Sequence, residues 1–214
     1  MEYYPVFLKL EGKKCLVVGG GDVAERKVEA LARCQADIHV VSPELTPGLQ
    51  KMSASGRIQH RAGFYRNGDL DGAFLVVSAA NDDSVNRTVA ADCAARNIMI
   101  NVVDDPDRCS FVVPSVVHRG PFKLAISTGG NSPQLARVIR EQLEKEFGPQ
   151  YGDFVNFLGR IREQARQNIG DPGRRRDVLN NLVDQVTLDM LKQGETERAK
   201  ERVRNVCPGS GCQS

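Results

Sequence analysis

The sequence predicts a doubly wound α/β fold, followed by a small β-rich segment and a helical C-terminal domain. Three observations support this prediction. Short apolar runs alternate with helical stretches through the first hundred residues, a glycine-rich turn follows the first run, and the pattern is wholly helical beyond Gly148-Pro149. Near-continuous apolar strands separated by helices indicate a parallel sheet that is covered on both faces.

Five predicted strands alternate with helices in the N-terminal half. The strands are short β-rich runs at 14–19, 37–42, 58–61, 74–79 and 99–103. The helices between them are predicted at 23–33, 46–55 and 83–96. We expect this part of the chain to form one domain, residues 1–113.

The pattern changes after Pro106. Three successive strands are predicted at 110–113, 116–119 and 122–128. A helix then opens at Ser132-Pro133, because Ser is a favourable N-cap and Pro suits the first helical position. Further helices are predicted at 151–168 and 175–191, with a break at 170–173 and a polar last segment. We expect a β-rich segment at 114–147 and a helical domain at 148–214.

Composition and charge argue against several classes of protein. Hydrophobic residues make up 41% of the 214 residues and charged residues 26%, as in ordinary globular proteins. The net charge of +2 indicates no nucleic-acid partner. No run approaches the roughly 20 apolar residues of a membrane span, and the N-terminus lacks the features of a secretory signal. We therefore expect a cytoplasmic protein without a membrane partner.

The cysteines and histidines form no recognisable metal motif. Four cysteines lie singly among apolar neighbours, as small core residues do: Cys15, Cys34, Cys93 and Cys109. Cys207 and Cys212 lie in a terminal segment that we expect to be frayed, and the alternative is that they form a metal clip or a redox pair. None of the three histidines has a metal-ligand spacing with another His or Cys, so we expect no structural metal site.

A glycine-rich turn follows the first predicted strand. Gly19, Gly21 and Ala24 occupy the special positions of a G-x-G-x-x-G/A motif between a strand and a helix. The first Gly permits the tight turn, the second lets the backbone approach a pyrophosphate, and the small third residue brings helix and strand together. The helix start, with Asp22 and Val23, offers unpaired N–H groups to an anion. The turn predicts a dinucleotide-binding Rossmann domain, and the alternative is a turn without a ligand.

The loops after two other strands bear on the cofactor. Glu44, next to Pro43, is the only carboxylate near the position at which NAD enzymes bind the ribose hydroxyls. No Arg lies immediately there to accept a 2′-phosphate, so NAD is favoured over NADP. The small residues Ala79 and Ala80 follow the strand at 74–79, where a loop commonly runs past the cofactor. We expect all four residues to contact NAD.

Four motifs together resemble the precorrin-2 dehydrogenase family. They are VVGGGDVAERK at 17–27, NVVDDP at 101–106, FVVPSVVHRGP at 111–121 and ISTGGNSPQLARVIRE at 126–141. Members of this family form the N-terminal module of siroheme synthase or stand alone, and some are also sirohydrochlorin ferrochelatases. The resemblance is strong from Tyr4 to Phe147 and weak beyond. It implies an NAD-binding Rossmann domain, a dimerisation segment at 114–147, a helical domain that closes over the site, and a homodimer.

The resemblance implies the oxidation of precorrin-2 to sirohydrochlorin. Precorrin-2 gives a hydride to NAD and loses a proton, so the protein must offer a proton acceptor. We expect this acceptor to be Asp104, which follows the strand at 99–103 and is the carboxylate of the family's NVVD motif. Asp105 is the nearby competitor. The alternative role for Asp104 is structural, because Asp-Asp-Pro is itself a turn signal.

The acetate and propionate groups of the substrate require cations and N–H donors. The Gly129-Gly130 loop precedes a helix and matches the family residue by residue, so its backbone could bind a carboxylate. The residues expected to bind substrate are His118, Ser127, Thr128, Gly129, Gly130 and Arg137. Iron insertion stays open because the family contains enzymes with and without it. Asp104 could serve that reaction too, with His118 as a helper.

Two other functions compete with this hypothesis. A sensor that binds NAD or a tetrapyrrole without turnover would usually carry a basic helix-turn-helix, and no convincing one is found. Another small NAD-dependent dehydrogenase would be expected to have a catalytic His in its C-terminal half, and no His follows His118. The favoured hypothesis is therefore an NAD-dependent precorrin-2 dehydrogenase.

Overall fold

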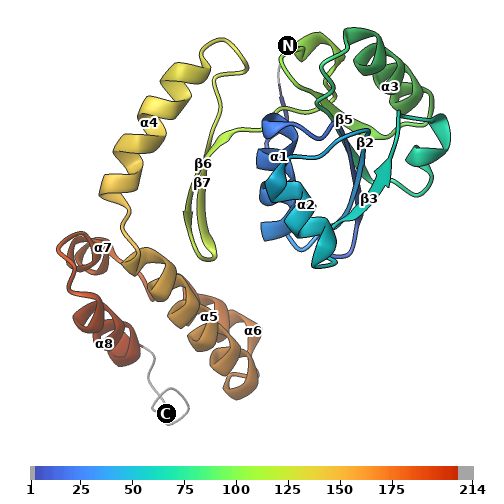
Figure 1. Ribbon diagram of the computed structural model, residues 1–214. Helices are drawn as coiled ribbons and strands as arrows, with labels where there is room; N and C mark the ends of the chain where they lie inside the picture. Colours follow the sequence, from blue (N-terminus) through green and yellow to red (C-terminus); the bar gives the residue numbers. More distant parts are fainter. Residues whose placement is uncertain (1–2, 207–214) are drawn as a thin grey trace. The chain divides into compact units, whose positions relative to one another are not determined.

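The computed structural model describes residues 3–206. The chain divides into two compact units, Met1–Val113 and Pro114–Ser214 (Figure 1). No helix within residues 3–206 combines the length and the apolar character that a membrane crossing requires. The expectation for Cys207 and Cys212 concerns residues outside this range.

The first unit is built on a five-stranded parallel sheet. Its strands are β1 (Lys14–Val18), β2 (Asp37–Ser42), β3 (Gln59–Ala62), β4 (Leu75–Ser78) and β5 (Met99–Val102). They lie in the order β3-β2-β1-β4-β5, so the direction in which strands are added reverses between β1 and β4. The predicted doubly wound fold is confirmed. In such sheets a ligand binds at the reversal, beyond the carboxyl ends of the strands.

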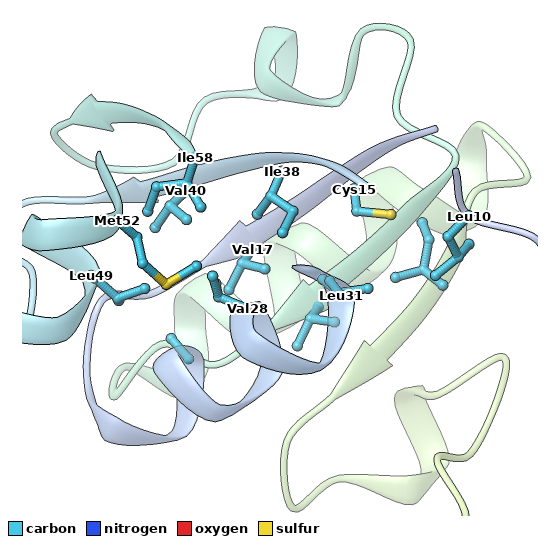
Figure 2. Close-up of a cluster of buried hydrophobic side chains, with 13 residues drawn as sticks. Leu10, Cys15, Val17, Val28, Leu31, Ile38, Val40, Leu49, Met52 and Ile58 are labelled. Atoms are coloured by element: carbon cyan, nitrogen blue, oxygen red, sulfur yellow. The ribbon is translucent and has the colours of Figure 1, made fainter. Parts of the chain in front are cut away.

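Helices cover both faces of this sheet because successive residues of each buried strand point to opposite sides. Cys15 and Val17 belong to one apolar cluster, whereas Leu16 and Val18 belong to the other. The covering helices are α1 (Asp22–Arg33), α2 (Pro47–Ala54) and α3 (Asp83–Ala95). Figure 2 shows the cluster in which side chains of α1 and α2 pack on the sheet. Two short 3-10 turns, η1 (Asn67–Leu70) and η2 (Pro106–Arg108), complete the unit.

The second unit combines an antiparallel strand pair with five helices in its described part. The elements are β6 (Ser115–Arg119), β7 (Phe122–Ile126), α4 (Pro133–Glu146), α5 (Gln150–Asn168), α6 (Pro172–Asn180), α7 (Gln185–Lys192) and α8 (Thr196–Val206). The helix predicted to open at Ser132-Pro133 is α4, and the Ser132 hydroxyl accepts the N–H of Leu135 at 3.2 Å. Aromatic and aliphatic side chains of α5 form the core with residues of the three later helices. The division of this unit into segments 114–147 and 148–214 stays a prediction.

The strand predicted at 110–113 is wrong, because these residues are irregular in the structure. Ser110 instead bonds the free edge of β5. Its N–H donates to the Ile100 carbonyl at 2.9 Å, and its hydroxyl accepts the Ile100 N–H at 2.8 Å. The apolar run that follows packs on the core through Phe111, which explains why its composition resembles that of a strand.

The single helix predicted at 175–191 is also wrong, since two helices occupy this stretch. Asp171 caps α6 through the Arg174 N–H at 2.6 Å, so this helix begins before the predicted start. Asp184 caps α7 and separates it from α6. The polar last segment forms α8, whose buried residues Ala199 and Val203 join the core.

Asp184 links α7 to α8 and makes the stability of the second unit depend on pH. The ion pair with Arg202 and the hydrogen bonds from the hydroxyl and N–H of Thr187, at 2.7 and 2.9 Å, hold the pKa of this carboxyl well below its usual range. A carboxyl whose pKa is lowered by folding stabilises the protein above its unfolded pKa, and this contribution is lost as the pH falls.

We therefore expect Asp184→Asn to lower the melting temperature of the second unit at neutral pH. The difference from the unsubstituted protein should shrink as the pH falls below about 4, where the unfolded carboxyl becomes protonated. Thermal unfolding followed by circular dichroism at a series of pH values measures it. Asp177→Asn, at an exposed carboxyl of α6, is the control. A difference that stays constant with pH would contradict the prediction.

Candidate active site

A cleft of about 630 Å³ opens at the carboxyl ends of the strands of the first unit. Its lining includes residues 19–21 after β1, 42–46 at and beyond the end of β2, 63–65 after β3 and 79–82 after β4. The cleft therefore includes the point between β1 and β4 at which the strand order reverses. This is where a doubly wound sheet binds a dinucleotide.

The glycine turn has the geometry that a dinucleotide needs. Gly19 has a φ of +123°, and a Cβ there would lie 2.4 Å from the Ala79 carbonyl oxygen. A Cβ on Gly21 would meet no protein atom within 4 Å, so the backbone at Gly21 faces open space. Ala24 is fully buried and brings α1 against the sheet.

The N-terminus of α1 is left without a side-chain cap. Gly21 is its N-cap residue, and Asp22 and Val23 begin the helix. In the same unit, Thr46 caps α2 and Asp82 caps α3 through side-chain oxygens. The first N–H groups of α1 are therefore available to an anion in the cleft. Together with the open backbone at Gly21, this fits the pyrophosphate of NAD.

The loop after β2 is joined to the glycine turn. The Thr46 N–H donates to the Gly20 carbonyl at 2.9 Å, and a Cβ on Gly20 would lie 2.0 Å from the Glu44 carbonyl oxygen. Pro43 and Glu44 both line the cleft, and both are exposed. Residue Glu44 thus lies on the side of the cleft where a ribose would lie if the pyrophosphate is at α1.

The loop after β4 is held by Asn86, a residue of α3 that the sequence reasoning missed. Its side chain is only 9% exposed. Its Oδ1 accepts the Ser78 hydroxyl at 2.7 Å and the Ala80 N–H at 3.3 Å, and its Nδ2 donates to the Ala80 carbonyl at 2.9 Å. Asn86 therefore fixes Ala79 and Ala80, which line the cleft. The available signal was a polar residue at an inward position of a predicted helix.

We expect Asn86→Leu to weaken cofactor binding by about tenfold, because the unpaired groups of Ser78 and Ala80 cost about 1–3 kcal/mol each and loosen the loop. Titration of NADH fluorescence measures the affinity, and thermal unfolding measures the accompanying loss of stability. The neighbouring exposed variant Arg87→Leu is the control. An Asn86→Leu protein that is less stable but binds NADH normally would show that this loop does not position the cofactor.

Asp104 lies two residues beyond the end of β5, at the same edge of the sheet. It is exposed and takes the left-handed backbone conformation, with a φ of +59°. It does not line the cleft. Its competitor Asp105 has structural partners, since its carboxylate accepts the Arg108 N–H at 3.3 Å and pairs with the Arg108 guanidinium at 2.7 Å. Which of the two carboxylates accepts a proton stays a prediction.

The residues expected to bind substrate all belong to the second unit. His118 is an exposed residue of β6. Gly129 and Gly130 have φ values of +62° and +87°, which explains why glycine occupies both positions. Ser127 accepts the Gly129 N–H at 3.1 Å, Thr128 accepts the Ser132 N–H at 3.1 Å, and Arg137 pairs with Glu141 at 2.9 Å. Their role in binding stays a prediction.

No group of three or more His, Cys, Asp or Glu residues that could hold a metal ion occurs within residues 3–206. The four cysteines of this range are free thiols, and Cys15 and Cys93 are buried as expected. Cys109 is half-buried and packs against the second apolar cluster, whereas Cys34 is exposed, so the prediction of a core residue is wrong for Cys34.

Three family models match successive parts of the chain. "Putative NAD(P)-binding" matches residues 6–115, just over half of the chain. "Sirohaem biosynthesis protein central" matches residues 119–146. "Sirohaem synthase dimerisation region" matches residues 150–205, whereas the resemblance had suggested 114–147 for dimerisation.

Known proteins of the same kind are similar to almost the whole chain. Siroheme synthase of Methylobacillus flagellatus is 42% identical over 99% of this chain and 45% of its own length. Siroheme synthase of Chromobacterium violaceum is 36% identical over the same shares. The chain thus spans less than half the length of these relatives. The solved structure of SirC, precorrin-2 dehydrogenase, is similar with a TM-score of 0.75 and 28% identity, over 94% of this chain and 100% of that chain.

The fold, the glycine turn and the comparisons agree. The five-stranded parallel sheet carries its cleft at the reversal of strand order, and the family model for NAD(P) binding covers this entire sheet. The resemblance seen in the sequence motifs is confirmed. The chain belongs to the NAD(P)-binding family shared by the precorrin-2 dehydrogenases and the matching part of the siroheme synthases.

Proposed function

We propose that this chain is an NAD-dependent dehydrogenase that oxidises precorrin-2 to sirohydrochlorin. The observation that carries the proposal is a cleft with a dinucleotide turn and an uncapped helix end, in a chain similar to SirC over that protein's whole length. Neither a tetrapyrrole sensor nor a small-acid dehydrogenase is favoured by a specific feature of the described residues.

The residues of the cleft hold the cofactor. When bound, NAD supplies the hydride acceptor. The N–H groups at the start of α1 and the backbone at Gly21 bind its pyrophosphate. The Glu44 carboxylate accepts hydrogen bonds from the ribose hydroxyls, and its negative charge disfavours the 2′-phosphate of NADP.

Asp104 accepts the proton that precorrin-2 loses. The substrate gives up one hydride and one proton, so a single carboxylate balances the protein's part of the reaction. The left-handed turn after β5 leaves this carboxylate exposed at the edge of the sheet. In this proposal, the Gly129-Gly130 backbone, Arg137 and His118 bind the acidic groups of the macrocycle, with Ser127 and Thr128 shaping the loop.

We also propose that the protein acts as a cytoplasmic homodimer. The match of residues 150–205 to a dimerisation region supports pairing through α5 to α8. Light scattering coupled to size-exclusion chromatography measures the oligomeric state. A monomer at micromolar concentration would contradict this part of the proposal.

The experiment that tests the function mixes purified protein with precorrin-2 and NAD. We expect the visible spectrum of sirohydrochlorin to appear together with NADH absorbance, and to appear more slowly with NADP. An unchanged spectrum and no NADH would exclude the dehydrogenase. A second arm adds ferrous iron to preformed sirohydrochlorin, and a metallation rate above that of the protein-free mixture would establish chelatase activity.

A further inference from the structure

Phe64, a residue of the cleft lining, has no part in the mechanism proposed so far. It lies in the loop after β3 and is 77% exposed, although aromatic side chains gain much from burial. Tyr65, the other aromatic residue of the lining, is already engaged. Its hydroxyl donates to the Asp92 carboxylate at 2.9 Å, and it packs on the apolar cluster at one face of the sheet. Among the described residues that line the cleft, Phe64 is thus the aromatic one that the protein leaves uncovered.

Two contacts fix the backbone at Phe64. The Gly63 N–H donates to the Ser42 carbonyl at 3.2 Å, which ties the loop to the end of β2. The Arg61 guanidinium donates to the Phe64 carbonyl at 2.8 Å. The same guanidinium is held by the Asp69 carboxylate, with Nε and Oδ1 2.7 Å apart. Because the backbone that carries the exposed side chain is already held, little further ordering is required when a ligand covers it.

The order of the strands identifies the part of the dinucleotide that this loop meets. In the proposed binding mode, the pyrophosphate lies at the start of α1 after β1, and the adenosine ribose lies at Glu44 after β2. β3 is the next strand on that side of the sheet, whereas β4 and β5 lie on the other side of β1. A dinucleotide spans the reversal, with one nucleotide on each side of it. The loop after β3 therefore meets the base beyond the adenosine ribose, which is the adenine.

A phenyl ring suits this base. Adenine is planar and uncharged at neutral pH, and it offers a π-face on which an aromatic side chain stacks. The nicotinamide ring of NAD could also stack on a phenyl ring, but it belongs to the nucleotide on the β4 side of the reversal.

We propose that Phe64 forms the adenine subsite of the cleft, with its ring stacked on the adenine of NAD. This inference rests on the proposed use of NAD. The contact is non-covalent and takes no part in the transfer of the hydride or the proton. Phe64 therefore determines how tightly the dinucleotide binds, and the rate at saturating NAD does not depend on it.

The first test measures the binding of ADP-ribose and of NADH by isothermal titration calorimetry. ADP-ribose carries the adenine, both riboses and the pyrophosphate, but it lacks the nicotinamide. We expect Phe64→Ala to weaken the binding of both ligands by the same factor, about tenfold, because each loses its stacking partner. An unchanged affinity for ADP-ribose, with or without a loss for NADH, would place the side chain away from the adenine and overturn the inference.

Two further variants separate stacking from a change in the fold. Phe64→Tyr keeps a planar ring and should bind both ligands within about twofold of the unsubstituted protein. Phe7→Ala, at another exposed phenylalanine of the first unit that does not line the cleft, should leave both affinities unchanged. The melting temperature of Phe64→Ala should also be unchanged, because the side chain is exposed. Lost binding with a lower melting temperature, and no recovery in Phe64→Tyr, would show a structural role and overturn the inference.

The second test locates the contact directly. NMR of protein labelled at phenylalanine, saturated with ADP-ribose, detects nuclear Overhauser effects between the adenine H2 and H8 protons and phenylalanine ring protons. We expect these effects in the unsubstituted protein and in Phe7→Ala, and we expect Phe64→Ala to remove them. Effects that persist in Phe64→Ala would assign the contact to a different phenylalanine and overturn the inference.

These tests distinguish a failure of the inference from a failure of the proposed function. If the unsubstituted protein does not oxidise precorrin-2 but Phe64→Ala weakens ADP-ribose binding, the dehydrogenase proposal fails and the adenine subsite stands. If precorrin-2 is oxidised with NAD but Phe64→Ala binds ADP-ribose normally, the dehydrogenase proposal stands and the adenine subsite fails.

Discussion

Asp104→Asn is expected to abolish precorrin-2 oxidation while NAD still binds. The amide is nearly the same size as the carboxylate but cannot accept a proton at neutral pH. Loss of a positioned general base costs about 10²–10⁴-fold in rate. Cofactor affinity should be unchanged, because Asp104 does not line the cleft formed by the glycine turn and the loops after β2 and β4.

The comparison with Asp105→Asn makes this experiment decisive. Asp105 caps η2 and pairs with Arg108, so its substitution should lower the melting temperature while the remaining folded protein keeps its turnover number. Initial rates with saturating NAD, normalised to folded protein, measure both variants. A full rate in Asp104→Asn, or a lost rate in Asp105→Asn, would show that we have assigned the wrong carboxylate.

Gly19→Ala is expected to damage both the fold and the cleft. The new Cβ would lie 2.4 Å from the Ala79 carbonyl oxygen, and the φ of +123° is one that only glycine adopts readily. Since backbone lies on both sides of the clash, no side-chain rotation relieves it. We expect a loss of about 3 kcal/mol or more in the free energy of unfolding, measured by urea denaturation, and no measurable NADH binding.

Gly21→Ala is the matched variant, two residues further along the same turn. Its Cβ would meet no protein atom within 4 Å, and its φ of −85° suits any residue. The unfolding free energy should therefore stay within about 0.5 kcal/mol of the original value. NADH affinity should nevertheless fall by at least about tenfold, because the methyl group occupies the space of the pyrophosphate. Normal NADH binding by Gly21→Ala would contradict our location of the cofactor.

Most of the first unit could be predicted because its strands are buried on both faces. The runs that became β1 and β4 are almost continuously apolar, β2 contains the buried apolar residues Ile38, Val40 and Val41, and each run is bounded by glycine, proline or polar residues. The run at 110–113 has the same composition, but its first residue bonds the edge of β5 through a side chain. An apolar composition indicates that a segment is buried. It does not distinguish a strand from an irregular segment that packs against a strand.

Helices α6 and α7 of the second unit were predicted as one helix, for a similar reason. Apolar residues continue on both sides of Asp184, whose side chain caps α7 through the Thr187 N–H and pairs with Arg202. Arg202 lies in α8, eighteen residues away. A contact at that separation leaves no periodic signal in the sequence.

Some residues of the candidate site could likewise be predicted from the sequence, and others could not. The glycine turn, Glu44 and the Ala79-Ala80 loop could be recognised because each carries a local constraint of backbone or charge. Asn86 could not, since its importance depends on the loop after β4, which the fold brings to it. Supporting residues of this kind emerge only from a three-dimensional structure.

The lack of a side-chain cap at the N-terminus of α1 has a thermodynamic consequence. The side-chain oxygens of Thr46 and Asp82 accept N–H groups at the starts of α2 and α3, whereas no side chain caps α1. A bound dinucleotide supplies the acceptor for the N–H groups of α1 and therefore acts as its cap. Binding of the dinucleotide in the cleft should therefore raise the thermal stability of the first unit. At concentrations above the dissociation constant, each tenfold increase in the concentration of free dinucleotide raises the free energy of unfolding by about 1.4 kcal/mol.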